Sequence, residues 1–360
     1  MKGLLLISLS LPLAAGAAMA QTIVDHSCTD LEDVPLSWID AVRAMDSHYA
    51  HTSHGSQLTY GMQFVEEWNS YYDVSIGNCY LPSTQDAYCV FDGQIGQGYI
   101  TPDLYWETED GLDMTRAVLD ANPTISTSMW SWCTQCDSYS EEQVQAYLDA
   151  MTLLEGEYPG VTFVYMTGNA QSTGSSGYNR WLRNQQIRDY CTASDKVLFD
   201  FEDLDCWWFD PASQQWEQHT YTYGSYQIPS EHPQFYGDEY GHTTAGSCTQ
   251  KGRAWWYMMA LIAGWGGTGI EEDGAPPAPL FTVECNPARG SARVSASGDI
   301  SGPIEMNVYD TSGRLACRLF SGEAPGGRFE VVFTPDAPGV YLLRCSSGDR
   351  IETQRLAVIR

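Results

Sequence analysis

The sequence predicts an α/β domain followed by a small all-β domain. Residues 161–166 and 196–201 are near-continuous apolar and β-branched runs, which are typical of buried parallel strands. Helical patterns lie between such runs, and this alternation implies a parallel sheet sandwiched between helices. Composition then shifts to a Gly/Pro/Glu-rich linker at residues 266–279, and short alternating strands with turn residues follow. We therefore expect an α/β domain over residues 21–265 and a β-sandwich over residues 280–360.

The first twenty residues predict an export signal. Lys2 supplies a positive start, residues 4–18 an apolar run, and Ala18 and Ala20 frame a cleavage site of the small-x-small type. The mature chain is expected to begin at Gln21 and to be secreted or held at the cell surface. Neither this run nor any later one is long enough to predict a membrane span.

Charge and cysteine content narrow the choice of partners. The formal net charge is −28, and such a surface repels nucleic acid and anionic membranes, so neither partner is expected. Export permits disulfides among the 11 cysteines, and Cys79 with Cys89 would close a loop. Cys133 and Cys136 could be a local disulfide, a redox pair or half a metal site. No second pair stands at zinc spacing, which favours a structural role.

A strand-to-helix junction stands out early in the chain. A short strand ends near His51, and a helix with apolar residues close to a 3.6 period runs to Trp68. Ser53 and Ser56 lie between them, where backbone N–H groups and the positive end of the helix dipole are presented. A serine there is either a nucleophile whose developing charge is stabilised or a helix cap.

The remaining elements follow in order. Long loops are expected over residues 70–112 and again over 202–241 because periodicity is weak there. A capping box at Ser140 and Gln143 predicts a helix that runs to about Glu157. The other expected elements are helices at residues 35–45, 115–121, 178–190 and 248–265, and strands at residues 124–132, 161–166 and 196–201.

Polar clusters follow three of the predicted strands, at residues 51–56, 130–135 and 167–169. Ligands bind at the carboxyl ends of strands in open parallel sheets, so these clusters predict an active site. An acyl-transfer serine needs a histidine base and donors for the oxyanion. His242, just before the last helix, is the expected base, and Glu239 or Asp238 could orient it.

This order of blocks resembles the SGNH/GDSL hydrolase superfamily, over about residues 45–265. The resemblance implies a flavodoxin-like three-layer sandwich with no cofactor and no metal. It also implies that Ser53, with Ser56 as the alternate, is the nucleophile and that Asn169 and Gly168 form the oxyanion hole. The chain departs from the family pattern because it has no Gly-Asp-Ser block, and Glu239 stands where an aspartate is usual.

The tail resembles the C-terminal sorting domain of the type IX secretion system, which has an immunoglobulin-like fold. The matching residues are Asn286-Pro287, residues 308–314, residues 338–341 and the closing residues 355–360. The resemblance implies an interaction with outer-membrane secretion machinery and export across an outer membrane.

These observations predict a secreted serine esterase that removes acyl groups from a polysaccharide or a related small-molecule or extracellular ester. The alternative is a non-catalytic carbohydrate-binding or adhesion protein, whose aromatic loops would line a sugar-binding cleft. A third possibility is a metal-dependent enzyme that uses His48, His51 and His54.

Overall fold

The structure is a computed structural model that describes residues 22–267 together with most of the C-terminal strands. Within the C-terminal part the described ranges are residues 280–283, 288–297, 303–310, 314–323, 328–335, 337–347 and 350–359. The predicted signal peptide, most of the predicted linker, and Asn286 and Pro287 lie outside the described residues. In the described part of the chain, no helix combines the length and apolar character that crossing a membrane requires.

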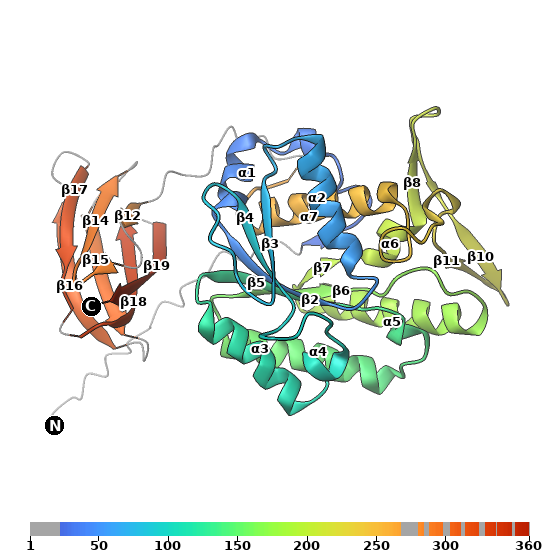
Figure 1. Cartoon of the computed structure of the whole chain (residues 1–360), viewed down its shortest axis with the longest axis horizontal. Coiled ribbons are helices and arrows are strands. Elements are labelled where there is room, and N and C mark those ends of the chain that lie inside the picture. The colour runs from blue at the N-terminus through green and yellow to red at the C-terminus, as the bar shows by residue number, and fades with distance from the viewer. Residues whose placement is uncertain are drawn as a thin grey trace, which may run out of the picture.

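A seven-stranded sheet forms the centre of the first part (Figure 1). Its strand order is β1-β7-β6-β5-β2-β4-β3, and every neighbouring pair is parallel, as the sequence predicts. Because all strands run the same way, their carboxyl ends meet along one edge. The strands are β1 (Ile23–Val24), β2 (Asp46–His51), β3 (Val74–Asn78), β4 (Tyr88–Asp92), β5 (Ile125–Ser131), β6 (Thr162–Met166) and β7 (Val197–Phe199).

Helices cover both faces of this sheet. Figure 1 shows α3, α4 and α5 along one side and α1, α2 and α7 along the other. Ser140 and Gln143 form the predicted capping box at the start of α4, with reciprocal bonds of 3.3 and 3.0 Å. The helices are α1 (Leu36–Arg43), α2 (Ser56–Trp68), α3 (Glu109–Ala121), α4 (Glu141–Glu157), α5 (Gly174–Ala193), α6 (Phe201–Cys206) and α7 (Ala245–Ile262).

Two predictions of long loops are wrong. Residues 70–112 contain β3, β4 and the 3-10 helix η2 (Pro102–Leu104), because their short apolar runs are long enough to pair at the sheet edge. Residues 202–241 fold into most of α6, two hairpins and the 3-10 helix η4 (Pro233–Phe235). The hairpins stand apart from the main sheet. In their strands, aromatic and polar residues alternate without an apolar run. They are β8 (Trp207–Asp210) with β9 (Gln215–Gln218), and β10 (Thr220–Tyr223) with β11 (Tyr226–Pro229).

The C-terminal part has a core of its own, formed between two sheets. Phe281, Val294 and Phe333 from one sheet share this core with Val308 and Leu343 from the other, which confirms the predicted all-β domain. One sheet contains β12 (Phe281–Val283), β14 (Ala292–Ser297) and β17 (Arg328–Phe333). The other contains β13 (Ala288–Arg289), β15 (Pro303–Asp310), β16 (Leu315–Glu323), β18 (Gly339–Ser347) and β19 (Arg350–Ile359).

Candidate active site

A cysteine and a histidine meet at the carboxyl ends of two adjacent central strands. Cys133 follows β5 and His54 follows β2, and these strands pair in parallel up to His51 and Ser131. The Nδ1 atom of His54 lies 2.9 Å from the Sγ atom of Cys133. Both side chains are partly or largely buried, so this contact forms in a place of limited solvent access.

The turn between β2 and α2 places His54 against Cys133. The first hydrogen bond of this turn runs from the Gly55 N–H to the Thr52 carbonyl, at 3.1 Å. The preceding N–H groups, of Ser53 and His54, have no acceptor among the described residues. A Cβ on Gly55 would lie 2.3 Å from the Cβ of His51, so only glycine fits. These backbone donors lie just before a 13-residue helix, in the same two residues whose hydroxyl and ring contact the Cys133 thiol.

Cys133 is held in place through its backbone. Its N–H donates to the Oε1 atom of Gln135 at 2.7 Å, and its carbonyl accepts a hydrogen bond from the side-chain amide of Asn169. Burial opposes ionisation of the thiol. Hydrogen bonding to His54, the charge of that ring and the hydroxyl of Ser53 outweigh burial and lower the pKa of Cys133 to about 6. A thiolate is thus favoured near neutral pH.

Gln171 fixes the orientation of the His54 ring. The His54 Nε2 atom lies 2.8 Å from Gln171 Oε1, while the Gln171 amide nitrogen donates to the carbonyl of His242 at 2.5 Å. Because that carbonyl can only accept, the amide oxygen must face His54, and Nε2 must carry a proton. Burial lowers the pKa of His54, but the Cys133 thiolate and the Gln171 bond raise it overall above its ordinary value.

A buried carboxyl stands behind Gln171. The Oε1 atom of Glu231 accepts from Gln171 Nε2 at 3.3 Å and lies 3.2 Å from the hydroxyl of Thr243. Burial and the nearby charge of Asp205 raise the pKa of Glu231 to about 7, against the opposing effect of Lys251. Cys133, His54, Gln171 and Glu231 therefore form one continuous chain of contacts.

The predicted serines lie at this site, but their recorded hydrogen-bond partners are not histidines. Ser53 Oγ lies 3.4 Å from the Sγ atom of Cys133, and Ser56 Oγ donates to the Ser53 carbonyl at 2.6 Å. Among the described side chains, neither hydroxyl hydrogen-bonds to a histidine, and neither caps α2, whose N-cap is Gly55. Ser53 borders the thiol, and Ser56 is turned toward the backbone.

Of the two carboxylates expected to orient His242, Asp238 contacts its ring and Glu239 does not. Its Nδ1 atom lies 2.9 Å from Asp238 Oδ1, whereas Glu239 accepts from the Asp238 backbone N–H and does not contact the ring. The His242 ring packs beside that of His54, with centroids 4.8 Å apart, and 48% of its side chain is exposed. His242 therefore reaches the site from the solvent side.

The expected oxyanion donors are engaged elsewhere. Asn169 uses its amide nitrogen on the Cys133 carbonyl, and the Gly168 N–H donates to Asn184 Oδ1 at 2.8 Å. The third strand end thus meets the other two, as predicted, but it contributes by positioning Cys133 and by supplying Gln171.

The three clustered histidines do not converge on a metal site. His48 is buried between Ser128 Oγ and the Gly93 carbonyl, each at 2.9 Å, and burial lowers its pKa to about 4. His51 instead faces Asp92, with 3.0 Å between Nε2 and Oδ1. Each ring has separate partners because strand alternation and the turn direct the three rings differently.

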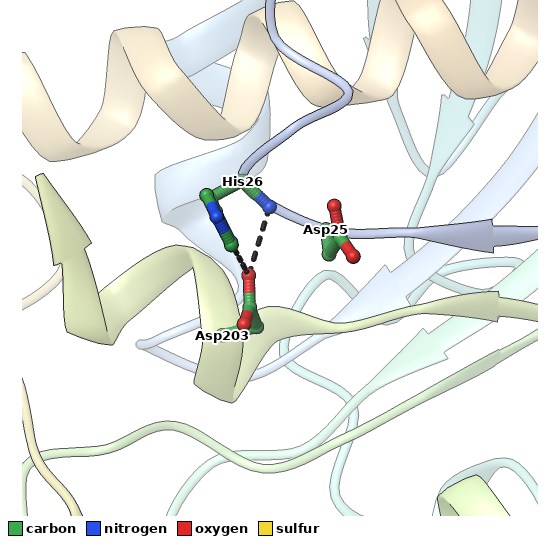
Figure 2. A group of neighbouring side chains, drawn as sticks. All are labelled: Asp25, His26 and Asp203. Atoms are coloured by element: carbon green, nitrogen blue, oxygen red, sulfur yellow. Dashed lines mark hydrogen bonds and ion pairs between the residues drawn. The ribbon is translucent and has the colours of Figure 1, made fainter. Parts of the chain in front are cut away.

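Within the described residues, one group of three side chains has the spacing of a cation site: Asp25, His26 and Asp203 (Figure 2). Its potential ligands already have hydrogen-bond partners within the chain. Asp203 Oδ1 accepts from the His26 backbone N–H at 2.8 Å and lies 2.6 Å from the ring Nδ1, and Asp25 accepts from Ser27. We assign this group a structural role, because it ties the end of β1 to α6.

The disulfides considered for Cys79 with Cys89 and for Cys133 with Cys136 do not form. All four of these described cysteines are free thiols. Cys79 contacts Asn78 at 3.1 Å and Cys89 contacts the Ala87 carbonyl at 3.5 Å, so the two do not pair with each other. The two cysteines of the CxxC pair also do not share the structural role expected for them. Cys136 is buried, whereas Cys133 is turned toward His54.

Comparisons with known proteins do not identify a family. No protein-family model and no curated protein matches the chain. Latent PorU from Porphyromonas gingivalis is 21% identical over 22% of this chain and 9% of its own, with a TM-score of 0.19. The PmoD soluble domain from Methylocystis is 16% identical over 20% of this chain and 75% of its own, with a TM-score of 0.17. An engineered protein is 12% identical over 86% of this chain and 60% of its own, with a TM-score of 0.22.

Proposed function

We propose that the chain is an acyl hydrolase in which Cys133 is the nucleophile, His54 the proton carrier and Gln171 the residue that orients His54. The observation that supports this most directly is the 2.9 Å contact between the thiol and a histidine whose other nitrogen is fixed by an amide. Nucleophile, base and orienting amide in this order are a known arrangement of cysteine hydrolases.

Each step of ester cleavage can be assigned to a group at the site. The Cys133 thiolate attacks the acyl carbon, and the carbonyl electron pair moves onto oxygen. The backbone N–H groups of Ser53 and His54, which have no acceptor among the described residues, would stabilise this oxyanion. Collapse expels the alkoxide, which takes the proton from His54 Nδ1 and leaves a thioester on Cys133. Water then gives a proton to His54 and attacks the thioester, which releases the acid and restores the thiolate.

The proposed substrates are acyl esters of extracellular polysaccharides. This class comes from the resemblance to SGNH hydrolases, and the strand order of the sheet supports the flavodoxin-like arrangement that the resemblance implies. The two-sheet C-terminal part supports the proposed immunoglobulin-like sorting domain and, with it, export to the cell surface or medium.

Alkylation and hydrolysis by matched variants test the proposal. Iodoacetamide at about pH 6.5 should modify Cys133 first, and acetylated xylan and p-nitrophenyl acetate should be hydrolysed. Cys133→Ser should lower hydrolysis by about a hundredfold or more, while the neighbouring Ser53→Ala should retain most of it. Undiminished hydrolysis by Cys133→Ser would exclude the thiol mechanism.

A serine mechanism is the second candidate, because His242 and Asp238 form an imidazole–carboxylate pair beside His54. Ser53 would then be the nucleophile. A fluorophosphonate adduct on Ser53, together with loss of hydrolysis in Ser53→Ala but not in Cys133→Ser, would select it. If neither the iodoacetamide adduct on Cys133 nor the fluorophosphonate adduct on Ser53 forms and no ester is hydrolysed, the non-catalytic carbohydrate-binding alternative is favoured.

A further inference from the structure

A hollow lies apart from the Cys133 site. It has a volume of about 690 Å³ and is lined by three segments: residues 27–32 before α1, the β8–β9 hairpin, and the first half of α7. None of Cys133, His54, Gln171 or Glu231 lines it. Residues 27–32 follow the carboxyl end of β1, which is an outermost strand of the sheet. The hollow therefore borders the edge formed by the strands' carboxyl ends, as the Cys133 site does, but at the β1 side.

An aromatic wall closes one side of the hollow. Trp216 is partly exposed and meets the His26 ring edge-on at 5.0 Å and that of Phe209 at 5.4 Å. His26 in turn stacks on Trp207 at 4.4 Å. Its ring is also fixed by the contact with Asp203, which Figure 2 shows. An isolated two-stranded hairpin is only marginally stable. These contacts stabilise the hairpin and hold Trp216 in one orientation. The indole is therefore positioned before any ligand arrives.

Hydrogen-bonding groups stand opposite this wall. The Gln250 amide nitrogen donates to the carbonyls of Leu204 and Trp207 at 2.9 and 2.8 Å, which fixes the amide and leaves its oxygen as an acceptor. Within the described residues, neither the Arg253 guanidinium nor the Glu32 carboxylate has a hydrogen-bond or ion-pair partner. The guanidinium is held over the Trp68 ring at 4.8 Å. The hollow thus combines one aromatic face with free donors and acceptors.

We infer that this hollow binds a neutral pyranose segment of a glycan. The C–H face of a sugar ring stacks on an indole, while its hydroxyls both donate to carboxylate and amide oxygens and accept from a guanidinium. Asp30 and Glu32 against one Arg253 leave the lining negative, which disfavours uronic acids and sulfated sugars. The site needs no thiol, so it does not rest on the proposed hydrolysis.

Calorimetric titration of the full chain with cellohexaose, xylohexaose and hexa-N-acetylchitohexaose tests this site. At least one should bind with a Kd of about 1 mM or tighter. Trp216→Ala should weaken that binding about tenfold or more. Trp181→Ala, a partly buried tryptophan that packs on Tyr226 at 5.5 Å, is the matched control and should bind as the parent does.

Glu32→Gln is the second variant, because it changes an exposed carboxylate without disturbing the hairpin. It should weaken binding about threefold to tenfold. The inference would be overturned if none of the three sugars bound with a Kd of about 1 mM or tighter, or if both variants bound as the parent does. Tighter binding of polygalacturonate than of these sugars would overturn it as well. Alkylation of Cys133 is measured separately on the same samples, so failure here is distinct from failure of the hydrolase proposal.

Discussion

The contact between His54 and Cys133 makes the reactivity of one thiol depend on pH in a measurable way. The thiolate is the reactive form, so alkylation of Cys133 by iodoacetamide should rise through a midpoint at about pH 6. In His54→Ala the midpoint should move up toward about 8.5, which lowers the thiolate fraction and hence the rate at pH 7 about thirtyfold. Mass-spectrometric timing of the adduct across a pH series provides the measurement.

Cys136 is the internal control for this experiment. It is 1% exposed, and burial raises the pKa of its thiol far above the ordinary value, so it should remain unmodified while Cys133 reacts. A midpoint that His54→Ala leaves unchanged would contradict the ion pair.

Glu231 predicts a pH dependence of stability, because its pKa is raised whereas that of Cys133 is lowered. It keeps its proton to about pH 7 when folded, whereas an unfolded glutamate loses it near about pH 4.3. The folded chain binds more protons between these values, so its stability falls as pH rises through this window. Glu231→Gln removes that penalty. Relative to the parent, the variant should gain on the order of 1–3 kcal/mol between about pH 4.5 and pH 8.

Urea unfolding at the two pH values measures this difference directly. Asp205 and Lys251 stay in place in the variant, and Gln can still bond to Gln171 and Thr243, so the comparison isolates the titration of one carboxyl. A variant whose relative stability is the same at both pH values would contradict a proton held by Glu231 in the folded state.

The sequence predicted where the polar clusters of the candidate site meet but not which residues contact one another there. Polar clusters at the ends of three strands are visible in the sequence, and the structure brings all three together. The contact between His54 and Cys133 spans 79 positions and depends on the register of β2 against β5. A lone CxxC pair does not reveal that register, and Gln171 and Glu231 had no motif to mark them.

At the scale of elements, two glycines set how closely α2 and α7 pack. A Cβ on Gly252 would lie 2.2 Å from the carbonyl carbon and oxygen of Gly61, which are backbone atoms and cannot rotate away. We expect Gly252→Ala to lower the free energy of unfolding by about 3 kcal/mol, near the upper end for an overpacked core. Urea unfolding of parent and variant gives this value.

Gly156→Ala is the matched control for Gly252→Ala. Gly156 lies within α4, is exposed, and has nothing within 4 Å of the position of its missing Cβ. Alanine is the better helix former, so this variant should gain about 0.5–1 kcal/mol. A loss in both variants, or in neither, would contradict the role of close α2–α7 packing.

The success of element prediction followed the strength of the local signal. The Ser140–Gln143 capping box and the apolar run of β6 each fix an element by local chemistry, and both were predicted. The β8–β9 and β10–β11 hairpins were missed because they lie outside the main sheet and show no continuous apolar run. Their pairing depends instead on tertiary contacts such as His26 against Trp207 and Trp216.

At the scale of the whole molecule, the apolar side chains of the described residues fall into two cores. One runs from Val24 to Ala260 and the other from Leu280 to Val358, and they have no buried member in common. A core of its own is what allows a domain to fold independently. The Cys133 site and the hollow beside Trp216 are both built entirely from residues that pack around the first core.

This separation predicts that residues 21–267 form a stable, reactive protein without the C-terminal part. Calorimetry of the full chain should show two unfolding transitions, and the shorter chain should keep one of them within about 2 °C. Cys133 should be alkylated with the same midpoint near pH 6 in both chains, because every contact that lowers its pKa lies in the first part. A single shared transition, or a shorter chain that unfolds well below the matching transition, would show instead that the two cores depend on each other.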